Sequence, residues 1–250
     1  MNIDFTNKTA LITGATRGIG KSIADCMYKA GANLVLTGTK KDEVEMLNAL
    51  NKKNGIDNIL YLQADFSDSG STGKFLKNLD QYNQIDICIN NAGVNKIDEF
   101  NDATIDDFNW IHEINVKVPF QILKVVGPKM IANNYGRVVN VASIWSVITR
   151  PGRSIYTLSK NALVGLTKTL AVEWASHNIM VNAVSPGFTL TELTKATNTK
   201  EQLESIEKLI PAHRMAEPDE IARVIAFLCS DLNSYLTGQN ITIDGGYTNV

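Results

Sequence analysis

The chain has 250 residues, of which 44% are hydrophobic and 20% charged, the composition of a folded globular protein and not of a disordered one. With 24 Lys and Arg against 26 Asp and Glu, the net charge is −2, so no basic excess exists to neutralise phosphates and nucleic acid is not an expected partner. The start lacks a signal-peptide pattern, no apolar run approaches the roughly 18 residues of a membrane helix, and three scattered cysteines and three scattered histidines predict neither a disulfide framework nor a metal site. We therefore expect a reduced, cytoplasmic protein that does not act at a membrane.

Short β-rich runs alternate with longer segments of helical periodicity. In chain order, strands are predicted at residues 9–13, 33–37, 59–63, 85–89, 136–141, 180–185 and 240–243, and clear helical spacing occurs at 19–30 and 156–176. Several strand runs are almost continuously apolar, as expected for a parallel sheet covered on both faces. The pattern predicts an α/β fold: one doubly wound (Rossmann) domain, residues 1–250, with about seven parallel strands and helices on both faces.

Residues 189–215 interrupt this alternation with a polar segment rich in Thr, Lys and Glu. Its first part, 189–200, has few apolar residues, whereas 201–210 carries a helical stripe of Leu203, Ile206, Leu209 and Ile210. The segment follows a strand at the edge where ligands of open α/β sheets bind. We predict a mobile lid that orders when ligands bind; a permanently docked surface helix is the alternative.

A glycine-rich turn, TGATRGIG, joins the first predicted strand to the first helix. Glycines allow a tight turn and a close backbone approach to a pyrophosphate, and the N–H groups of the helix point at the anion. A simple strand–helix turn is the alternative, but the position after the first strand favours a dinucleotide site. The residues expected to bind are Gly14, Thr16, Arg17, Gly18, Ile19 and Gly20.

The end of the second predicted strand bears on the choice between NAD and NADP. An acidic residue there would bind the ribose 2′-hydroxyl and repel a 2′-phosphate. Instead the strand ends in Gly38, Thr39 and Lys40, and the first acid is Asp42. Arg17 in the glycine loop can reach the same phosphate with its planar guanidinium. A solvated pair of lysines at 40 and 41 is the alternative, but together with Arg17 the pattern favours NADP(H) as cofactor.

Four polar residues further along form a recognisable set. Tyr156 and Lys160 are four apart, so their side chains share one face of a helix. Ser143 follows the fifth predicted strand and Asn115 lies in a helical stretch. A ketone that receives hydride develops negative charge on its oxygen, and Tyr156 is the proposed acid and base. Lowering a tyrosine pKa from about 10 to near 7 takes about 4 kcal/mol, roughly what a lysine charge about 4 Å away supplies.

With these motifs the sequence resembles the short-chain dehydrogenase/reductase family, most closely its 3-oxoacyl-acyl-carrier-protein reductase branch. The resemblance runs from about residue 8 to the end and includes T-G-x-x-x-G-I-G, N-N-A-G, the Asn–Ser–Tyr–Lys tetrad, Pro186-Gly187 and a late I-D-G-G. It implies that Lys160 also holds the nicotinamide ribose, that Asn115 holds a water of a proton relay, and that Ser143 binds the carbonyl oxygen. Further cofactor contacts carried over by position are Asp65, Phe66, Asn91, Ala92, Gly93, Pro186, Gly187 and Thr189, in addition to Tyr156 and Lys160.

The substrate is less sharply indicated. Trp145 and Arg153 are candidate substrate contacts beside Ser143 and Tyr156. For Trp145 the alternative is core packing. Arg150 and Arg153 could bind an anionic group of the substrate, and the alternative for them is that they are solvated loop charges. The reaction expected is NADP(H)-dependent reduction of a ketone to a secondary alcohol, with a 3-oxoacyl thioester first and a small ketone, sugar or polyol second.

Partners and rival functions follow from the same residues. An acyl carrier protein is a candidate partner, although residue 172, where that branch often has a basic residue, is Val. We expect a homotetramer, because apolar residues such as Trp110, Phe120 and Trp174 exceed what one sheet face should cover. A non-catalytic dinucleotide sensor would not need the tetrad, and a nucleotide-sugar epimerase usually has a longer C-terminal substrate domain.

Overall fold

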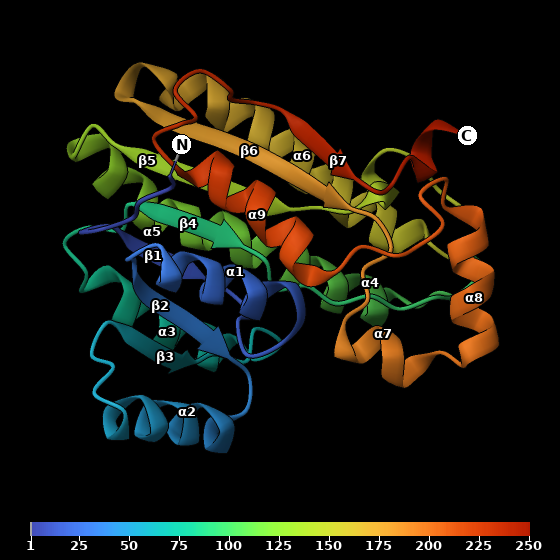
Figure 1. Ribbon diagram of the computed structural model, residues 1–250, viewed down its shortest axis with the longest axis horizontal. Helices are drawn as coiled ribbons and strands as arrows, with labels where there is room; N and C mark the ends of the chain where they lie inside the picture. Colours follow the sequence, from blue (N-terminus) through green and yellow to red (C-terminus); the bar gives the residue numbers. More distant parts are fainter. Residues whose placement is uncertain (1) are drawn as a thin grey trace.

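Seven parallel strands form one sheet in the order β3-β2-β1-β4-β5-β6-β7 (Figure 1). The structure is a computed structural model, and it describes residues 2–250 apart from the side chains at positions 193 and 197. The order turns back between β1 and β4, and such a switch point opens a crevice at the carboxyl ends of the strands. The strands are β1 (Thr9–Ile12), β2 (Asn33–Gly38), β3 (Ile59–Gln63), β4 (Ile87–Asn90), β5 (Gly136–Val141), β6 (Ile179–Pro186) and β7 (Asn240–Ile243).

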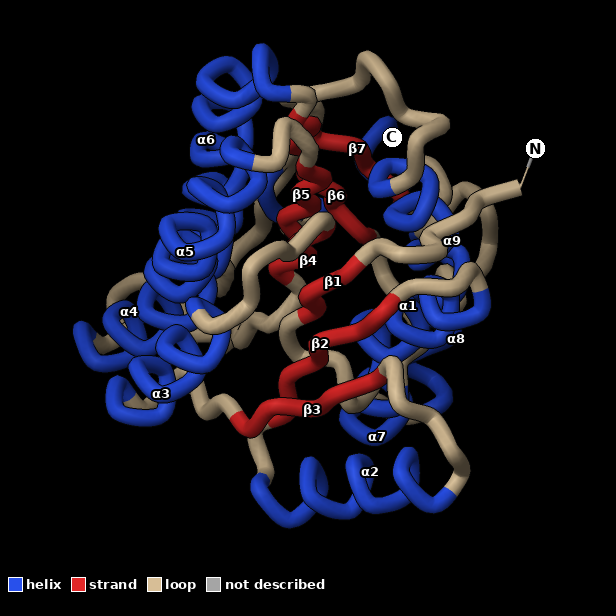
Figure 2. The backbone as a smooth tube through the Cα atoms, turned by 90° about the vertical axis from the view of Figure 1, so that its left-hand side faces the viewer, coloured by secondary structure: helices blue, strands red, loops and turns tan. Residues whose placement is uncertain are grey.

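Helices cover both faces of this sheet. Figure 2 shows α1 and α9 on one side, α3 to α6 on the other, and α2 beside the edge strand β3. Each face has its own apolar cluster, one between α1, α9 and the sheet and one beneath α3, α5 and α6. The helices are α1 (Gly18–Lys29), α2 (Lys41–Lys53), α3 (Ser69–Asp80), α4 (Ile105–His112), α5 (Val118–Ala132), α6 (Ser154–Trp174), α7 (Glu192–Thr197), α8 (Lys200–Leu209) and α9 (Pro218–Cys229).

The predicted doubly wound α/β fold is confirmed, with strand boundaries within two residues of those expected. For the central strands β1, β2, β4, β5 and β6, burial on both faces explains the agreement, because their apolar runs carry a strong signal. Within the described residues, no helix is long and apolar enough to cross a membrane. The same residues contain no group of three or more His, Cys, Asp or Glu placed to hold a metal ion.

The insertion at 189–215 forms α7 and α8, which lie beyond the carboxyl ends of the strands (Figure 1). A capping box, Thr199 with Gln202, starts α8. Both ends of the insertion are tied together, because Leu190 N donates to Ala216 O and Ala216 N donates to Phe188 O, at 2.8 and 2.9 Å. Of the expected apolar stripe, Ile210 is buried, Leu203 and Ile206 are half-buried and Leu209 is exposed, since α8 ends at Leu209 and the chain turns inward after it.

The lid, and with it the assignment of residues 1–250 to one domain carrying it, stays a prediction. Hydrogen exchange tests the lid directly. We expect fast exchange over residues 189–210 in the protein alone and clear protection once nicotinamide cofactor and substrate are both bound. Equal protection in the two states would leave the docked-helix alternative.

Candidate active site

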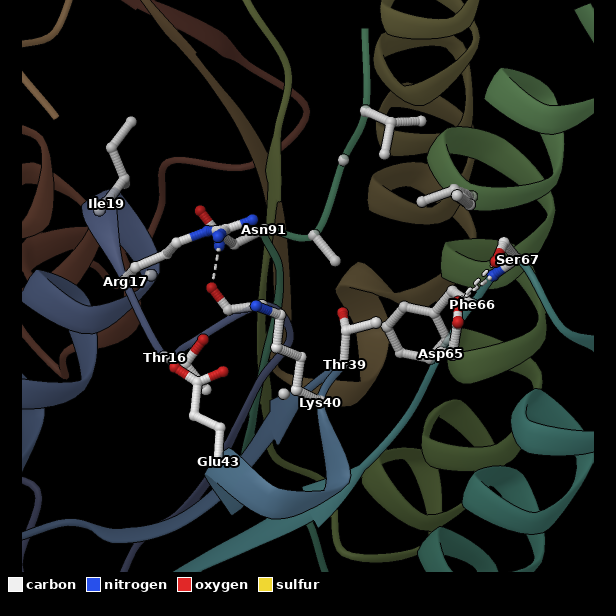
Figure 3. A pocket seen from close by; sticks show the side chains of 18 of the residues that line it. Thr16, Arg17, Ile19, Thr39, Lys40, Glu43, Asp65, Phe66, Ser67 and Asn91 are labelled. Carbon is white, nitrogen blue, oxygen red and sulfur yellow. Dashed lines mark hydrogen bonds between the residues drawn. The ribbon is translucent and has the colours of Figure 1, made fainter. Parts of the chain in front are cut away.

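A cavity of about 560 Å³ lies where the carboxyl ends of β1, β2 and β4 meet. The glycine loop forms its floor, the end of β2 and the segment after β3 form two walls, and the start of α7 reaches it from the insertion (Figure 3). The lining residues are Gly14, Thr16, Arg17, Gly18, Ile19, Gly20, Gly38, Thr39, Lys40, Glu43, Asp65, Phe66, Ser67, Asn91, Ala92, Gly93, Val94, Trp110, Ile114, Thr191 and Glu192.

The glycine loop takes a backbone path that side chains would block. Gly14 and Gly18 have φ values of +64° and +56°, in the left-handed region. A Cβ at Gly20 would overlap the Gly14 carbonyl oxygen and lie 2.5 Å from Asn91 Nδ2. The first turn of α1, within the described residues, has neither a side-chain cap nor an acidic residue. Its N–H groups therefore stay available for an anion, and the loop fits a dinucleotide pyrophosphate.

Asn91 and Thr13 hold this loop against the end of β4. Asn91 Nδ2 donates to the carbonyl oxygens of Thr13 and Gly14 at 2.9 and 3.0 Å, and Thr13 Oγ1 accepts from the backbone N of Asn91 and Ala92. The Asn91 amide is thus engaged with the loop itself, one part of which is drawn in Figure 3. These hydrogen bonds fix the shape of the loop.

The end of the cavity where adenosine is expected lies against β2. A Cβ at Gly38 would come within 2.6 Å of Thr16 Cγ2, so glycine lets the loop pack on the strand end. Thr39, Lys40 and Arg17 line this end as predicted. Glu43, which the sequence reasoning did not single out, also lines the cavity and projects into it from the start of α2 (Figure 3). A carboxylate here bears on the choice between NAD and NADP.

The predicted cofactor residues divide into two groups in space. Those of the glycine loop and of positions 38–40, 65–66 and 91–93 line the cavity. Tyr156 and Lys160 on α6, and Pro186, Gly187 and Thr189 at and after the end of β6, do not. Trp110, for which the sequence favoured core or subunit contact, also lines the cavity and is 38% exposed, so it is not a core residue. No periodicity signalled this, because the residue belongs to an amphipathic helix whose neighbours are known only in three dimensions. The other lining residues missed from the sequence are Ser67, Val94, Ile114, Thr191 and Glu192.

Asn115 occupies a π-helical turn, Glu113–Lys117, between α4 and α5. Its side chain is fully buried and clamps the chain after β4, with Oδ1 accepting from Val94 N at 2.8 Å and Nδ2 donating to Val94 O at 2.9 Å. The same Nδ2 donates to Ser159 Oγ on α6 at 3.1 Å. Such single π-turns often occur at functional sites because they redirect one side chain. Here the turn joins the N-N-A-G segment to the helix of the tetrad.

Gly93 connects the cavity to this tetrad. A Cβ placed on Gly93 would lie 3.2 Å from Lys160 Nζ and 3.3 Å from Asn115 Oδ1. Lys160 is 2% exposed, donates to Val141 O at 2.8 Å, and lies 5.6 Å from the centre of the Tyr156 ring. The structure thus brings Asn115, Lys160 and Tyr156 to one end of the dinucleotide cavity.

Burial is the strongest influence on Tyr156 and raises the pKa of its hydroxyl. A hydrogen bond from the Ser143 hydroxyl and the positive charge of Arg153 act in the opposite direction and lower this pKa. The sequence predicted that Lys160 lowers this pKa. In the structure the lowering comes instead from Ser143 and Arg153, which the loop between β5 and α6 carries to the same place, and burial outweighs both.

Burial lowers the pKa of Lys160 from 10.5 to about 8. In the protein without cofactor, the unfolded chain then holds this proton between pH 8 and 10.5 while the folded chain has released it, so stability rises with pH through that window. The change corresponds to about 3 kcal/mol. Below pH 8 both states are charged and the cost of burial is constant.

Lys160→Met removes this dependence. We expect the variant to be more stable than the unsubstituted protein at pH 7, and the difference in unfolding free energy to shrink by about 3 kcal/mol as pH rises from 8 to 10.5. Urea denaturation of both proteins at matched pH measures it, and the subtraction cancels the titration of other groups. Parallel pH curves would contradict the assigned pKa.

Three aromatic rings pack in a row beyond Ser143. Trp145, 6% exposed, lies in the turn after β5, and Phe188 after β6 meets it edge-on at 6.4 Å between ring centres. Tyr247 near the C-terminus packs edge-on against Phe188 at 5.2 Å. Trp145, predicted as either pocket wall or core, is thus buried beside two partly exposed rings, and Arg150 and Arg153 lie near it.

Known proteins are similar to this chain over almost its whole length. A family model described as enoyl-(acyl carrier protein) reductase matches residues 14–248. The chain is 38% identical over 248 residues to an NAD-dependent glycerol dehydrogenase of Listeria innocua, covering 99% of this chain and 96% of that one. It is 35% identical over 244 residues to the 3-oxoacyl-[acyl-carrier-protein] reductase FabG of Rickettsia conorii, covering 98% of each.

Solved structures have the same fold as this chain. A gluconate 5-dehydrogenase from Burkholderia cenocepacia, in complex with NADP and tartrate, superposes with a TM-score of 0.90 at 28% identity, covering 99% of this chain and 97% of that one. A glycine-rich cavity beside the Asn–Ser–Tyr–Lys set defines an oxidoreductase that uses a nicotinamide dinucleotide, NADP or NAD. The chain belongs to the short-chain dehydrogenase/reductase family.

Proposed function

We propose that this protein is an NADP(H)-dependent reductase that converts a ketone to a secondary alcohol. The observation that carries the proposal is the contact through Gly93, which puts Lys160 and Asn115 at the end of the dinucleotide cavity. When bound, the cofactor supplies the hydride. The chain must then hold the carbonyl oxygen and deliver one proton to it.

Particular residues can hold the carbonyl oxygen and deliver the proton. The Ser143 hydroxyl lies near enough to that of Tyr156 to lower its pKa, and a carbonyl oxygen placed between the two hydroxyls would accept from both. Tyr156 gives its proton to that oxygen as negative charge develops. Lys160 and Arg153 stabilise the resulting phenolate, because both are cations close to a buried site. The part of Asn115 in a water relay stays a prediction.

A 3-oxoacyl thioester is the first substrate candidate, supported by the similarity to the FabG reductase. A small ketone, sugar or polyol is the second, supported by the similarity to glycerol and gluconate dehydrogenases. Docking of an acyl carrier protein is the weaker proposal, because Val172 is 83% exposed on α6 where the branch often has a basic residue.

The test is a spectrophotometric assay of NADPH oxidation. Acetoacetyl thioesters, simple ketones and ketosugars are offered in turn, and the corresponding alcohols are offered with NADP⁺. We expect turnover with at least one class of ketone. Binding of NADPH without turnover on any of them would favour a non-catalytic dinucleotide sensor.

We also propose a homotetramer. Apolar side chains stand exposed on α4, α5 and α6, among them Ile105 at 74%, Phe120 at 51% and Val172 at 83%. A groove beside Phe120, His112 and Leu166 lies on the same surface. A patch of this kind is typical of a subunit interface. Trp174, expected to be part of it, packs instead on Gly127.

Light scattering at micromolar concentration measures the assembly. We expect the mass of four chains, and a smaller mass for Phe120→Asp, because a charge in the patch is costly to bury. Leu60→Asp, a 43% exposed residue on the edge strand β3, is the matched control and should leave the mass unchanged. A mass of one chain for the unsubstituted protein would refute the proposal.

A further inference from the structure

The loop between β5 and α6 places two cations beside one indole. The guanidinium carbons of Arg150 and Arg153 lie 5.2 and 5.4 Å from the centre of the Trp145 ring. Arg150 is exposed, but Arg153 is only 7% exposed. Arg153 immediately precedes α6, three positions before Tyr156, so the two side chains are neighbours across one helical turn.

Arg153 has no counter-charge within the part of the chain that the structure describes. Its guanidinium makes neither a hydrogen bond nor an ion pair there, and its Nε is buried without a partner. Burial and the like charge of Arg150 lower the pKa of Arg153, and the group acting the other way is the Tyr156 hydroxyl. An arginine side chain carries five donors in a planar fork, and burying it unpaired is costly. A bound anion beside Arg153 would offset the cost of burying this charge.

The loop holds this arginine in place rather than leaving it free. Gly152, with φ +77°, packs against Ile97, since a Cβ there would lie 2.9 Å from Ile97 Cγ2. Thr149 and Thr157 share a hydroxyl hydrogen bond of 3.1 Å, which ties the loop to the first turn of α6. That turn has neither an acidic residue nor a side-chain cap among the described residues, so its N–H groups also favour an anion.

We propose that the substrate carries an anionic group, a carboxylate or a phosphate, which binds the guanidinium of Arg153 while its ketone lies between Ser143 and Tyr156. Trp145 supports the guanidinium, and Arg150 adds a second, solvent-facing cation. This inference rests on the proposed function and narrows its substrate class to small oxo acids or phosphorylated ketones. Hydride adds to the carbonyl carbon, and the Tyr156 proton goes to the oxygen. The anionic group takes no part in these bond changes and is the same in substrate and product.

The first experiment compares charged and neutral forms of one ketone. Each oxo acid is assayed beside its methyl ester, and each ketone phosphate beside the parent hydroxyketone. For the best charged substrate we expect kcat/KM to exceed that of its neutral partner by about 10-fold or more, as for a charge-assisted bidentate contact. Arg153→Met should lower kcat/KM on both substrates, because Arg153 also acts on Tyr156, but the loss should be about 10-fold larger on the charged substrate, so that the preference disappears. Arg153→Lys should restore part of the preference.

Lys168→Met is the matched control, because it removes one exposed cation from α6, the same helix, at a position 12 residues after Tyr156. It should keep the preference for the charged substrate. Equal losses on charged and neutral substrates in Arg153→Met would overturn the proposal, since Arg153 would then act through Tyr156 alone.

A binding measurement separates this inference from the proposed reaction. Malonate and inorganic phosphate are titrated against the cofactor-loaded protein while tryptophan fluorescence is followed, because Trp145 lies against the arginine. We expect saturable binding of at least one of them that is lost in Arg153→Met and kept in Lys168→Met, and the anion that binds identifies the group. Absence of binding overturns the anion site even if neutral ketones are reduced. Binding without any ketone reduction would refute the proposed function and leave the anion site standing.

Discussion

Tyr156→Phe is expected to lower kcat by about 100- to 10,000-fold while leaving cofactor affinity within about 3-fold of the unsubstituted value. The hydroxyl is the proton donor, and it also accepts the Ser143 hydrogen bond that helps lower its pKa against the effect of burial. Phenylalanine keeps the ring and its packing beside Lys160, so the fold and the dinucleotide cavity should persist. Turnover is measured with the best ketone of the panel, and affinity by fluorescence titration with NADPH.

Tyr61→Phe is the matched control, because Tyr61 is a half-buried tyrosine on β3 that takes no part in the tetrad. Its turnover should stay close to that of the unsubstituted protein. A Tyr156→Phe variant that kept more than a tenth of kcat would show that another group protonates the substrate oxygen.

The second large effect concerns the choice of cofactor. We expect NADPH to bind roughly 10- to 150-fold more tightly than NADH, because the two differ by the 2′-phosphate alone and a charge-assisted contact is worth that much. Arg17 and Lys40 line the end of the cavity where this phosphate would lie. Arg17→Ala should bring the two affinities together by weakening NADPH binding, and parallel fluorescence titrations with both cofactors measure the change.

Glu43 makes this test sharper, because its carboxylate shares that end of the cavity and would repel a 2′-phosphate. Glu43→Gln should therefore widen the preference for NADPH. Lys21→Ala, on α1 but outside the cavity lining, is the control for loss of one cation and should leave the ratio unchanged. Tighter binding of NADH by the unsubstituted protein would contradict the assignment and agree with the NAD-dependent glycerol dehydrogenase that the chain resembles.

The fold, the glycine-rich loop and the pairing of Tyr156 with Lys160 were predictable from local sequence. Strands buried on both faces must be apolar throughout, and a turn that approaches a pyrophosphate must be glycine-rich, so β1 and the loop ending at Gly20 carry their own signals. Tyr156 and Lys160 share a helix, and a spacing of four determines that they share a face. For these features the relevant neighbours are a few residues away in the chain.

Features that depend on distant neighbours were decided by the tertiary structure alone. The π-turn that points Asn115 at Val94 and Ser159 has no spacing signature. Glu43 and Trp110 line the cavity only because the start of α2 and the last turn of α4 lie beside it. Arg153 could be placed near the site from sequence, but not its burial without a partner, since that depends on what every other element leaves unfilled around it. Periodicity records which face of an element is buried; only packing determines what it is buried against.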